Sequence, residues 1–403
     1  MIEKINYKSI KNALQITWQI TCQELRHIFT DSGVVIIFFA AGLLYPLVYG
    51  LVYFNETLTE VSVAVVDNSH SSMSREFIRK IDATPDLKVN FSSASMEQAK
   101  LLFAENKVRG IIFIPSSFSD DLHTGKQTTV SAFSSMASML YYRAVYSGVN
   151  YVSLNMGQKV QMENLVSKGL TQRQAQVSAS PILSEVRSLY NPKGGYASFL
   201  VPSILILVIQ QTLVLGIGIL AGTAREENTF HHLIPIQKKY HGTLRIVLGK
   251  SFAYFILYAF IASYNLMVIP RVFNLPQIDD FVTLFIFMIP LILACIFFAM
   301  SMSVFFADRE VVFLLYLFSS IPLLFISGSL WPQDYIPTFW KAMSYFFPST
   351  FGVQGYIKIN SMGASFSQIK FEYFGLWFQA GIYFIFTFFV YRWQIADSEK
   401  RLN

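Results

Sequence analysis

The chain has 403 residues, of which 53% are hydrophobic and only 14% are charged, and its formal net charge is +6 at pH 7. One soluble core could not bury so much apolar surface, so the composition predicts an integral membrane protein and excludes an ordinary soluble domain. The basic residues stand beside apolar runs instead of forming one patch with interleaved aromatic residues, so we expect no nucleic-acid partner.

The N-terminal region, residues 1–32, predicts an amphipathic helix on the cytoplasmic side. Apolar residues recur at three-, four- or seven-residue steps over residues 8–29, opposite a polar face. They are Ile10, Leu14, Trp18, Leu25 and Phe29. We expect this helix to rest in the inner membrane interface, in contact with membrane lipid; a protein partner covering the same face is the alternative. A first membrane span then follows over 33–54, with Asp31-Ser32 as its cap and Pro46 inside it. This first apolar run is too long for the core of a removable signal peptide, so we expect it to be retained.

Residues 55–195 have a different character, because no apolar run there is long enough to span a membrane and charges of both signs are interspersed. Strands are expected over 61–66, 88–91, 110–114 and 128–133, a turn over 67–69, and a helix over 74–81. Two further helices, over 139–168 and 171–190, are expected to form a stalk. The pattern predicts a mixed α/β extracytoplasmic domain inserted between the first and second spans.

The second half of the chain, residues 196–403, predicts five more membrane spans. They are expected over 196–222, 251–269, 281–306, 311–330 and 372–391. Residues 223–250 form a polar loop rich in lysine and arginine, and Arg392, Lys400 and Arg401 follow the last span. Because basic residues mark cytoplasmic segments, both termini and this loop are expected in the cytoplasm, and the fold is a polytopic α-helical membrane protein with six transmembrane helices.

Two segments look like nucleotide-binding motifs but lack the required context. In residues 242–251 the ending Gly249-Lys250-Ser251 suits a phosphate-binding loop, yet the glycine spacing is wrong and no strand precedes it. The glycines of residues 216–221 lie inside an expected span, where small residues allow close helix packing. With histidines scattered and Cys22 far from Cys295, the sequence predicts no catalytic residues, metal site or cofactor in this chain.

Polar residues inside the expected spans are candidates for a translocation path. Gln210 and Gln211 lie near the middle of the second span, where an unsatisfied amide is costly. Hydrogen bonding between helices is the simpler interpretation, and lining a path for a partly apolar substrate is the functional one. The remaining candidates for this path are Asn265, Ser319, Ser320 and Pro322.

Short motifs along nearly the whole chain carry a family resemblance. They are Val65-Val66-Asp67-Asn68-Ser69, Ile112-Phe113-Ile114-Pro115, Tyr190-Asn191-Pro192, Arg225-Glu226-Glu227-Asn228-Thr229 with Pro235, Leu248-Gly249-Lys250, Ser327-Gly328, Trp331-Pro332, Pro337 and Pro348. In this order the chain resembles the ABC-2-type permeases, in particular the half-size, bacterial multidrug-type subunits of type V ABC exporters with a large external domain.

The resemblance implies a cytoplasmic ABC ATPase subunit, which binds ATP and Mg and docks on residues 224–250. The implied coupling residues are Arg225, Glu226, Glu227, Asn228, Thr229 and Pro235, with Asn228 standing where glycine is usual. It also implies a second permease subunit, as a homodimer or heterodimer, and an outer re-entrant region over 331–350. The residues of this outer motif are Ser327, Gly328, Trp331, Pro332, Pro337 and Pro348. In such exporters the external domain shapes the exit path or meets a periplasmic adaptor protein.

The sequence is compatible with two functions. The first is the permease subunit of an ATP-driven exporter in the bacterial cytoplasmic (inner) membrane, which moves a hydrophobic or amphipathic substrate outward. The alternative is a membrane-anchored extracytoplasmic binding or assembly protein without transport activity.

Overall fold

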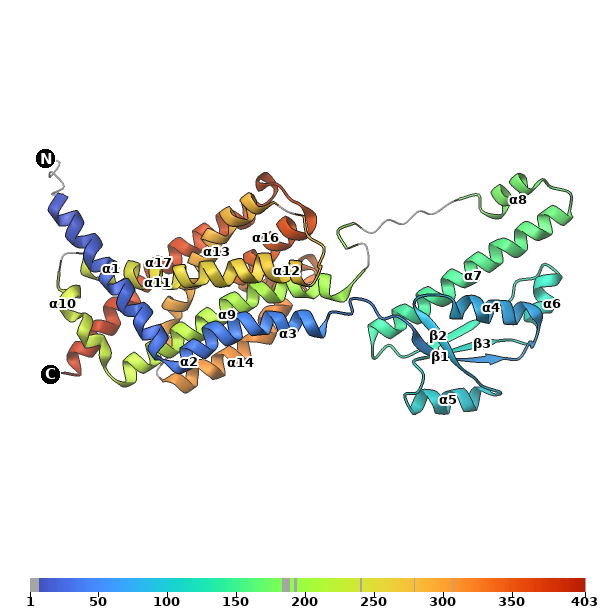
Figure 1. Cartoon of the computed structure of the whole chain (residues 1–403), viewed down its shortest axis with the longest axis horizontal. Helices are drawn as coiled ribbons and strands as arrows, with labels where there is room; N and C mark the ends of the chain where they lie inside the picture. Colours follow the sequence, from blue (N-terminus) through green and yellow to red (C-terminus); the bar gives the residue numbers. More distant parts are fainter. Residues whose placement is uncertain are drawn as a thin grey trace. The chain divides into compact units, whose positions relative to one another are not determined.

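The computed structural model describes residues 7–182, 189–191, 194–239, 241–278, 280–306 and 308–402 (Figure 1). The chain divides into two compact units. One comprises Met1–Glu56 and Ser188–Asn403 and is helical; the other, Thr57–Arg187, contains a sheet. Each unit has its own buried apolar core.

The sheet of the second unit has the strand order β2-β1-β3-β4. The strands are β1 (Val61–Asp67), β2 (Leu87–Ser92), β3 (Gly110–Ile114) and β4 (Ser131–Ser134). The central strand β1 is parallel to β2 and β3, whereas β4 pairs antiparallel with β3 at the edge. Both faces of β1 are buried, which explains its continuous apolar sequence.

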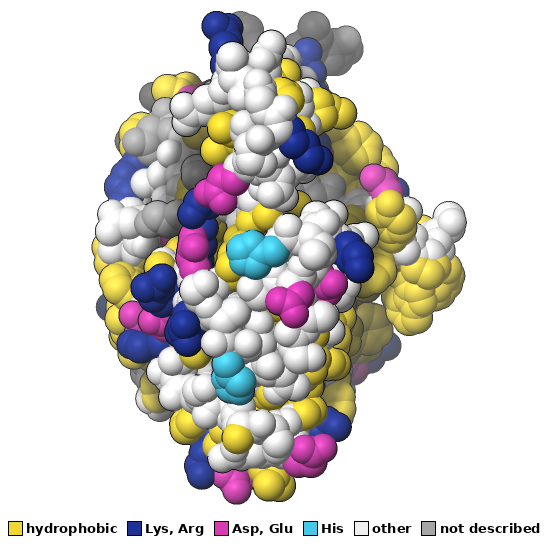
Figure 2. Space-filling view, turned by 90° about the vertical axis from the view of Figure 1, so that its right-hand side faces the viewer, with side chains coloured by type: hydrophobic (Ala, Val, Ile, Leu, Met, Phe, Trp, Pro, Cys, Tyr) yellow, Lys and Arg dark blue, Asp and Glu magenta, His cyan; other side chains and the backbone are white. Residues whose placement is uncertain are grey.

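Helices cover the two faces of this sheet. They are α4 (Ser72–Asp82), α5 (Met96–Ala104), α6 (Phe118–His123) and α7 (Met139–Ser167), and a further helix, α8 (Gln172–Ala179), packs against α7. One face packs against α4, α6 and α7, and the other packs against α5. Glu76 of α4 bridges to Lys159 of α7 at 3.1 Å, and the hydrogen bonds from Lys159 and Lys80 lower the pKa of Glu76. Acidic and basic side chains are interspersed on the face in Figure 2 and do not gather into one patch of a single sign.

The predicted strands are present in this unit, although β4 begins at Ser131 instead of residue 128. The predictions about its helices were less accurate, because the short helices α5 and α6 were not predicted. The helix expected over 171–190 ends at Ala179, because Ser180 precedes Pro181 and a residue before proline is driven out of the helical region. Residues 183–188 of that expected helix lie outside the described residues. Helix α7, which was expected to form part of a stalk, contributes Val145, Val149 and Met156 to the core of the sheet unit.

In the helical unit, six helices of the described residues are long and apolar enough to cross a membrane. They are Ser32–Val52, Tyr196–Glu226, Gly242–Val272, Phe281–Phe305, Arg309–Ile326 and Lys370–Lys400. With 94% of its most apolar window buried, Tyr196–Glu226 (α9) is the central helix of the bundle. Length and composition therefore support a polytopic membrane protein, and α9 carries the two mid-span glutamines, Gln210 and Gln211.

Several of these membrane helices are built from consecutive segments. The first comprises α2 (Ser32–Val35), the π-helical η1 (Ile36–Leu44) and α3 (Tyr45–Val52); the third comprises α11 (Gly242–Ser263), the π-helical η3 (Tyr264–Val268) and α12 (Ile269–Val272). Each π-helical segment ends just before a proline, Pro46 or Pro270. A wider turn next to the proline accommodates it locally. Asp31 caps the first span as predicted, since its carboxylate accepts hydrogen bonds from the N–H groups of Gly33 and Val34.

The remaining elements complete the C-terminal half. They are η2 (Thr229–Leu233), α10 (Ile234–Gln237), α13 (Phe281–Met302), η4 (Ser303–Phe305), α14 (Arg309–Ile326), η5 (Gln333–Tyr335), α15 (Thr338–Ser344), α16 (Pro348–Met362), η6 (Phe366–Gln368) and α17 (Lys370–Lys400). Helix α11 begins at Gly242 instead of residue 251, and α17 extends to Lys400 instead of 391. The loop expected over 223–250 is thus shorter, because helices occupy both of its ends. Helix α16 runs past the boundary expected at residue 350.

The N-terminal helix α1 (Tyr7–Thr30) packs along α11 and does not rest on lipid alone. Thr21 and Glu24 are buried, and the Thr21 hydroxyl donates to the Gly249 carbonyl at 2.9 Å. Its stripe of Leu14, Trp18 and Phe29 stays exposed beside this contact. The exposed stripe retains the predicted amphipathic character and is available to lipid.

Candidate functional site

The segment between α9 and α11 begins with a sharp change of direction at Asn228. This residue has φ 55° and ψ 27°, in the left-handed region. Glycine adopts this region most easily, and asparagine is among the most tolerant of the other residues. The asparagine therefore supports the conformation that a glycine would allow, and its Oδ1 additionally accepts a hydrogen bond from the Ser398 hydroxyl at 2.6 Å.

Arg225 and Glu226 tie the start of this segment to the connection between α13 and α14. The Arg225 guanidinium donates to the carbonyls of Val304 at 3.1 Å and Phe306 at 3.0 Å. The Glu226 carboxylate accepts from the backbone N–H of Arg309, the first residue of α14, at 3.1 Å. A displacement of this segment therefore acts directly on the start of α14.

The six predicted coupling residues do not all face outward. Glu226, Glu227 and Pro235 are exposed, whereas Arg225, Asn228 and Thr229 are half-buried. Beyond them, the exposed side chains of the segment between α9 and α11 are His232, Lys238, Lys239 and His241. We call the exposed residues Glu227, His232, Pro235, Lys238 and Lys239 the docking surface, because the sequence resemblance implies that an ATPase would dock on this segment.

The sequence did not reveal how closely this segment packs on the end of α17. Phe230 is buried, and its ring lies 6.2 Å from that of Tyr391. Lys238 forms an ion pair of 2.5 Å with Glu399, and a hollow of about 480 Å³ lies beside them, lined in part by Arg392. An aromatic residue inside a polar loop was the only sequence signal for this packing.

The two mid-span glutamines of α9 both form hydrogen bonds between helices. The Oε1 atom of Gln210 accepts from the backbone N–H of Ser349 in the first turn of α16, at 2.7 Å. The Nε2 atom of Gln211 donates to the hydroxyls of Ser319 at 3.3 Å and Ser320 at 3.4 Å, both on α14. The geometry thus brings Gln211 and Ser319 together. It agrees with the simpler interpretation of the two glutamines, which is hydrogen bonding between helices.

Some buried polar atoms in the helical unit have no hydrogen-bond partner among the described residues. They include Nε2 of Gln210, Oγ of Ser349 and both amide atoms of Asn265. Asn265 is fully buried on the π-helical η3 and does not bond to either glutamine. Such atoms require a water molecule, a ligand or a changed conformation, so they keep the candidate path open as a hypothesis.

The outer motif residues form the turns that begin short helices. Gly328 has φ 88°, and a Cβ there would lie 2.5 Å from the Gln333 side chain, so the turn after α14 needs glycine. Pro332 and Pro337 precede η5 and α15, and Pro348 opens α16. Ser327 is buried, whereas Trp331 is exposed. Pro192, a further part of the sequence resemblance, lies outside the described residues.

The Gly249-Lys250-Ser251 look-alike lies inside α11, where it contacts α1. A Cβ on Gly249 would lie 2.8 Å from Ile20, and Lys250 pairs with Glu24 at 2.5 Å. A phosphate-binding loop instead presents free backbone N–H groups ahead of a helix. These residues therefore serve helix packing.

A family model for the ABC-2 family transporter proteins matches residues 32–389, which is most of the chain. The chain belongs to this family. This ABC-2 permease is similar to the linearmycin resistance permease protein LnrN of Bacillus subtilis (strain 168), with 34% identity over 103 residues. That alignment spans 26% of each chain, so the comparison covers about a quarter of LnrN. No solved structure matches the chain.

Membership confirms the resemblance to ABC-2 permeases. Proteins of this family are membrane transport subunits and are not catalytic themselves. The chain is accordingly an ABC-2 family protein with several helices that are long and apolar enough to cross a membrane.

Proposed function

We propose that this permease is the membrane subunit of an ATP-driven exporter, and that a separate cytoplasmic ATPase docks on the surface between α9 and α11. The observation that carries the proposal is the linkage from this segment to α14. Glu226 and Arg225 hold the start of α14 and the end of the α13 segment, and α14 in turn contacts Gln211 of the central helix. A push from an ATPase on this segment would therefore reach the middle of the bundle.

The charges favour a cytoplasmic position for the docking surface. Lys238 and Lys239 belong to it, and Lys400 ends α17 with Arg401 directly after it. Basic residues at the ends of spans mark the cytoplasmic side. We propose that both termini lie in the cytoplasm of a bacterium, that the helices cross its inner membrane, and that the sheet unit is extracytoplasmic.

The proposed substrate is hydrophobic or amphipathic. The interior of the bundle has a large apolar core and also buries polar side chains, among them the groups of Asn265 and Gln210 that have no partner among the described residues. The similar protein LnrN is named for resistance to linearmycin, and a resistance permease is consistent with outward transport of such a compound. ATP and Mg would be bound by the partner chain and not by this one.

A dimer of permeases is part of the same proposal. Helix α14 exposes large apolar side chains along its length, including Phe313, Leu314, Phe318 and Ile321. Only 12% of its most apolar window is buried, against 94% for α9. A second permease subunit, identical or different, would cover this helix and place the path at the dimer interface; a periplasmic adaptor would meet the sheet unit.

The decisive experiment is co-purification of an ABC ATPase with this permease. Glu227→Lys, on the docking surface, is expected to abolish co-purification, because it reverses an exposed charge. The control Glu97→Lys makes the same charge change on α5 of the sheet unit and is expected to retain the ATPase.

Two results would contradict the proposal. Equal co-purification of the ATPase with Glu227→Lys and Glu97→Lys would remove the docking surface from the mechanism. A wild-type permease that captures no ATPase would favour the alternative, a membrane-anchored extracytoplasmic binding or assembly protein.

A further inference from the structure

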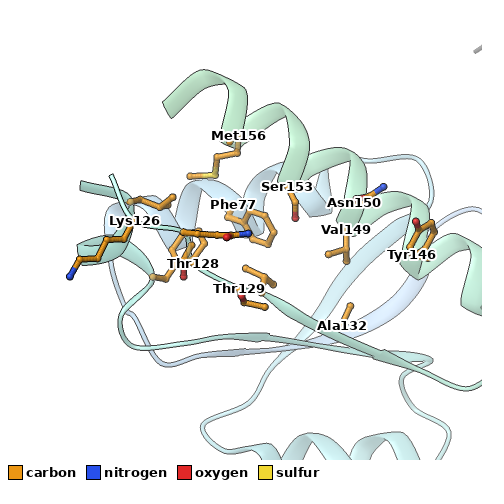
Figure 3. A pocket seen from close by; sticks show the side chains of 15 residues that line it. Phe77, Lys126, Thr128, Thr129, Ala132, Tyr146, Val149, Asn150, Ser153 and Met156 are labelled. Atoms are coloured by element: carbon orange, nitrogen blue, oxygen red, sulfur yellow. The ribbon is translucent and has the colours of Figure 1, made fainter. Parts of the chain in front are cut away.

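The sheet unit contains a cavity of about 500 Å³ between α7 and the segment that leads into β4 (Figure 3). Lys126 and Tyr146 mark its two ends, with Phe77, Val149 and Ala132 between them. All its lining residues belong to the sheet unit, so the cavity is a property of that unit alone. Its volume lies within the range of roughly 300–1,000 Å³ that is typical of small-molecule sites.

The walls of this cavity combine an apolar floor with polar side chains and one cationic side chain. Phe77 and Met156, which line it, are 2% and 4% exposed, so its floor is part of the core of the unit. Lys126 is the sole charged residue among the lining side chains, and it is exposed at one end. Lys126 forms no ion pair of 4.0 Å or less with another residue that the structure describes. An apolar floor with a cation at one end matches a ligand that has an apolar chain and one negative charge.

Polar side chains line the cavity beside Lys126. Gln127, Thr128 and Thr129 follow this lysine in the chain, and Gln127 and Thr129 are exposed. Their amide and hydroxyl groups can hydrogen-bond an acidic head group next to the cation.

We propose that this cavity binds a single-chain anionic amphiphile, such as a fatty acid or an alkyl sulfate. The apolar chain would lie against Phe77, Val149 and Met156, and the acidic head would lie near Lys126 and Thr128. A ligand with two long chains exceeds a cavity of this size. Binding at this site requires neither an ATPase nor transport, so the inference stands independently of the proposed export.

The test uses the full-length permease in lipid nanodiscs, without ATPase. A palmitic acid analogue with a diazirine near the end of its chain is photo-crosslinked, and the labelled peptides are identified by mass spectrometry. We expect labelling of peptides that contain residues 126–132 or 149–157, beside labelling of the membrane helices. Labelling confined to the membrane helices would overturn the proposal.

Two pairs of variants make the assignment specific. Ser153→Trp fills the cavity, whereas Leu154→Trp places the same side chain on an exposed position of the same helix that does not line it. Lys126→Glu removes the cation, whereas Lys100→Glu changes an exposed lysine on α5. Labelling of the sheet unit should fall about tenfold in Ser153→Trp and Lys126→Glu, as a loss of one strong contact predicts, and should be unchanged in both controls. Equal labelling within either pair would refute the site.

Two further probes define the ligand class. A hexadecylamine with the same diazirine carries the opposite charge and should label the sheet unit about tenfold less, since Lys126 repels it. A phosphatidylglycerol with a diazirine in one chain tests whether the source is a membrane lipid, and it should not label this unit. Preferential labelling by the amine or by the phospholipid would contradict the single-chain anionic assignment.

Discussion

The buried ion pair between α1 and α11 allows a quantitative test of how the N-terminal helix is held. The Lys250 ammonium lies 2.5 Å from the Glu24 carboxylate, with the two side chains 15% and 3% exposed. The Tyr254 hydroxyl also donates to this carboxylate. Lys250→Met removes the cation while preserving most of the side-chain volume. The Glu24 carboxylate then stays buried, and of these two partners only the Tyr254 hydroxyl still donates to it.

Breaking one partner of a buried ion pair typically costs about 3–5 kcal/mol, because the other charge stays buried without compensation. We expect Lys250→Met to lower the free energy of unfolding by about 3 kcal/mol, at the lower end of this range, since Tyr254 still stabilises the carboxylate. The double variant Glu24→Gln with Lys250→Met should recover most of that loss, because no charge is then buried.

The unfolding equilibrium can be measured by titrating the permease in mixed micelles with sodium dodecyl sulfate while following tryptophan fluorescence. Lys238→Met is the control, since its ion pair with Glu399 has the same length but side chains 64% and 38% exposed. An exposed pair contributes about 0–1 kcal/mol. If Lys250→Met and Lys238→Met lowered stability equally, or if the double variant recovered nothing, the ion pair would not anchor α1.

Three further predictions concern other contacts. Gly249→Val should lower the free energy of unfolding by about 1–3 kcal/mol in the same titration, because its side chain would collide with Ile20; an unchanged midpoint would contradict this packing. Glu76→Gln should lower the melting temperature of the sheet unit at pH 7 but much less at pH 3. The pKa of Glu76 has an ordinary value of 4.5 and is lowered in the folded state by the hydrogen bond from Lys159. The stabilisation that this ion pair gives is therefore fully present above pH 4.5 and is lost as the pH falls through the lowered pKa. Gln211→Leu should weaken helix association by about 0.6–1.7 kcal/mol in the dodecyl sulfate titration, as loss of a hydrogen bond between membrane helices predicts, and no change would show that its contacts with α14 contribute nothing.

Local sequence signals predicted the elements that depend on local chemistry. The β1 strand, the Asp31 cap and the centres of the apolar spans follow from residues that are neighbours in sequence. The start of α11 could not be found this way. By its sequence neighbours, Lys250 is typical of a polar loop. It can lie inside α11 because Glu24, which is far away in sequence, pairs with its charge where α1 and α11 pack together.

The candidate site shows the same limit. Arg225 and Asn228 belong to a polar segment, and polar segments are expected at the surface. Here the end of α17 and the α13–α14 connection cover them, through Ser398 and the carbonyls of residues 304 and 306. The sequence could name the segment, but only the packing of distant helices separates its internal residues from its exposed ones.

The contacts of α1 give this helix a place in the proposed coupling. In its C-terminal third, Glu24 holds Lys250, which lies after the docking surface in α11. Just past its end, Asp31 forms an ion pair with Arg309 at 2.9 Å, and Glu226 accepts from the backbone of the same arginine. The segments on both sides of the docking surface are therefore joined through α1 and the start of α14. A movement that carries Lys250 along with the docking surface would break a buried ion pair unless α1 moves with it.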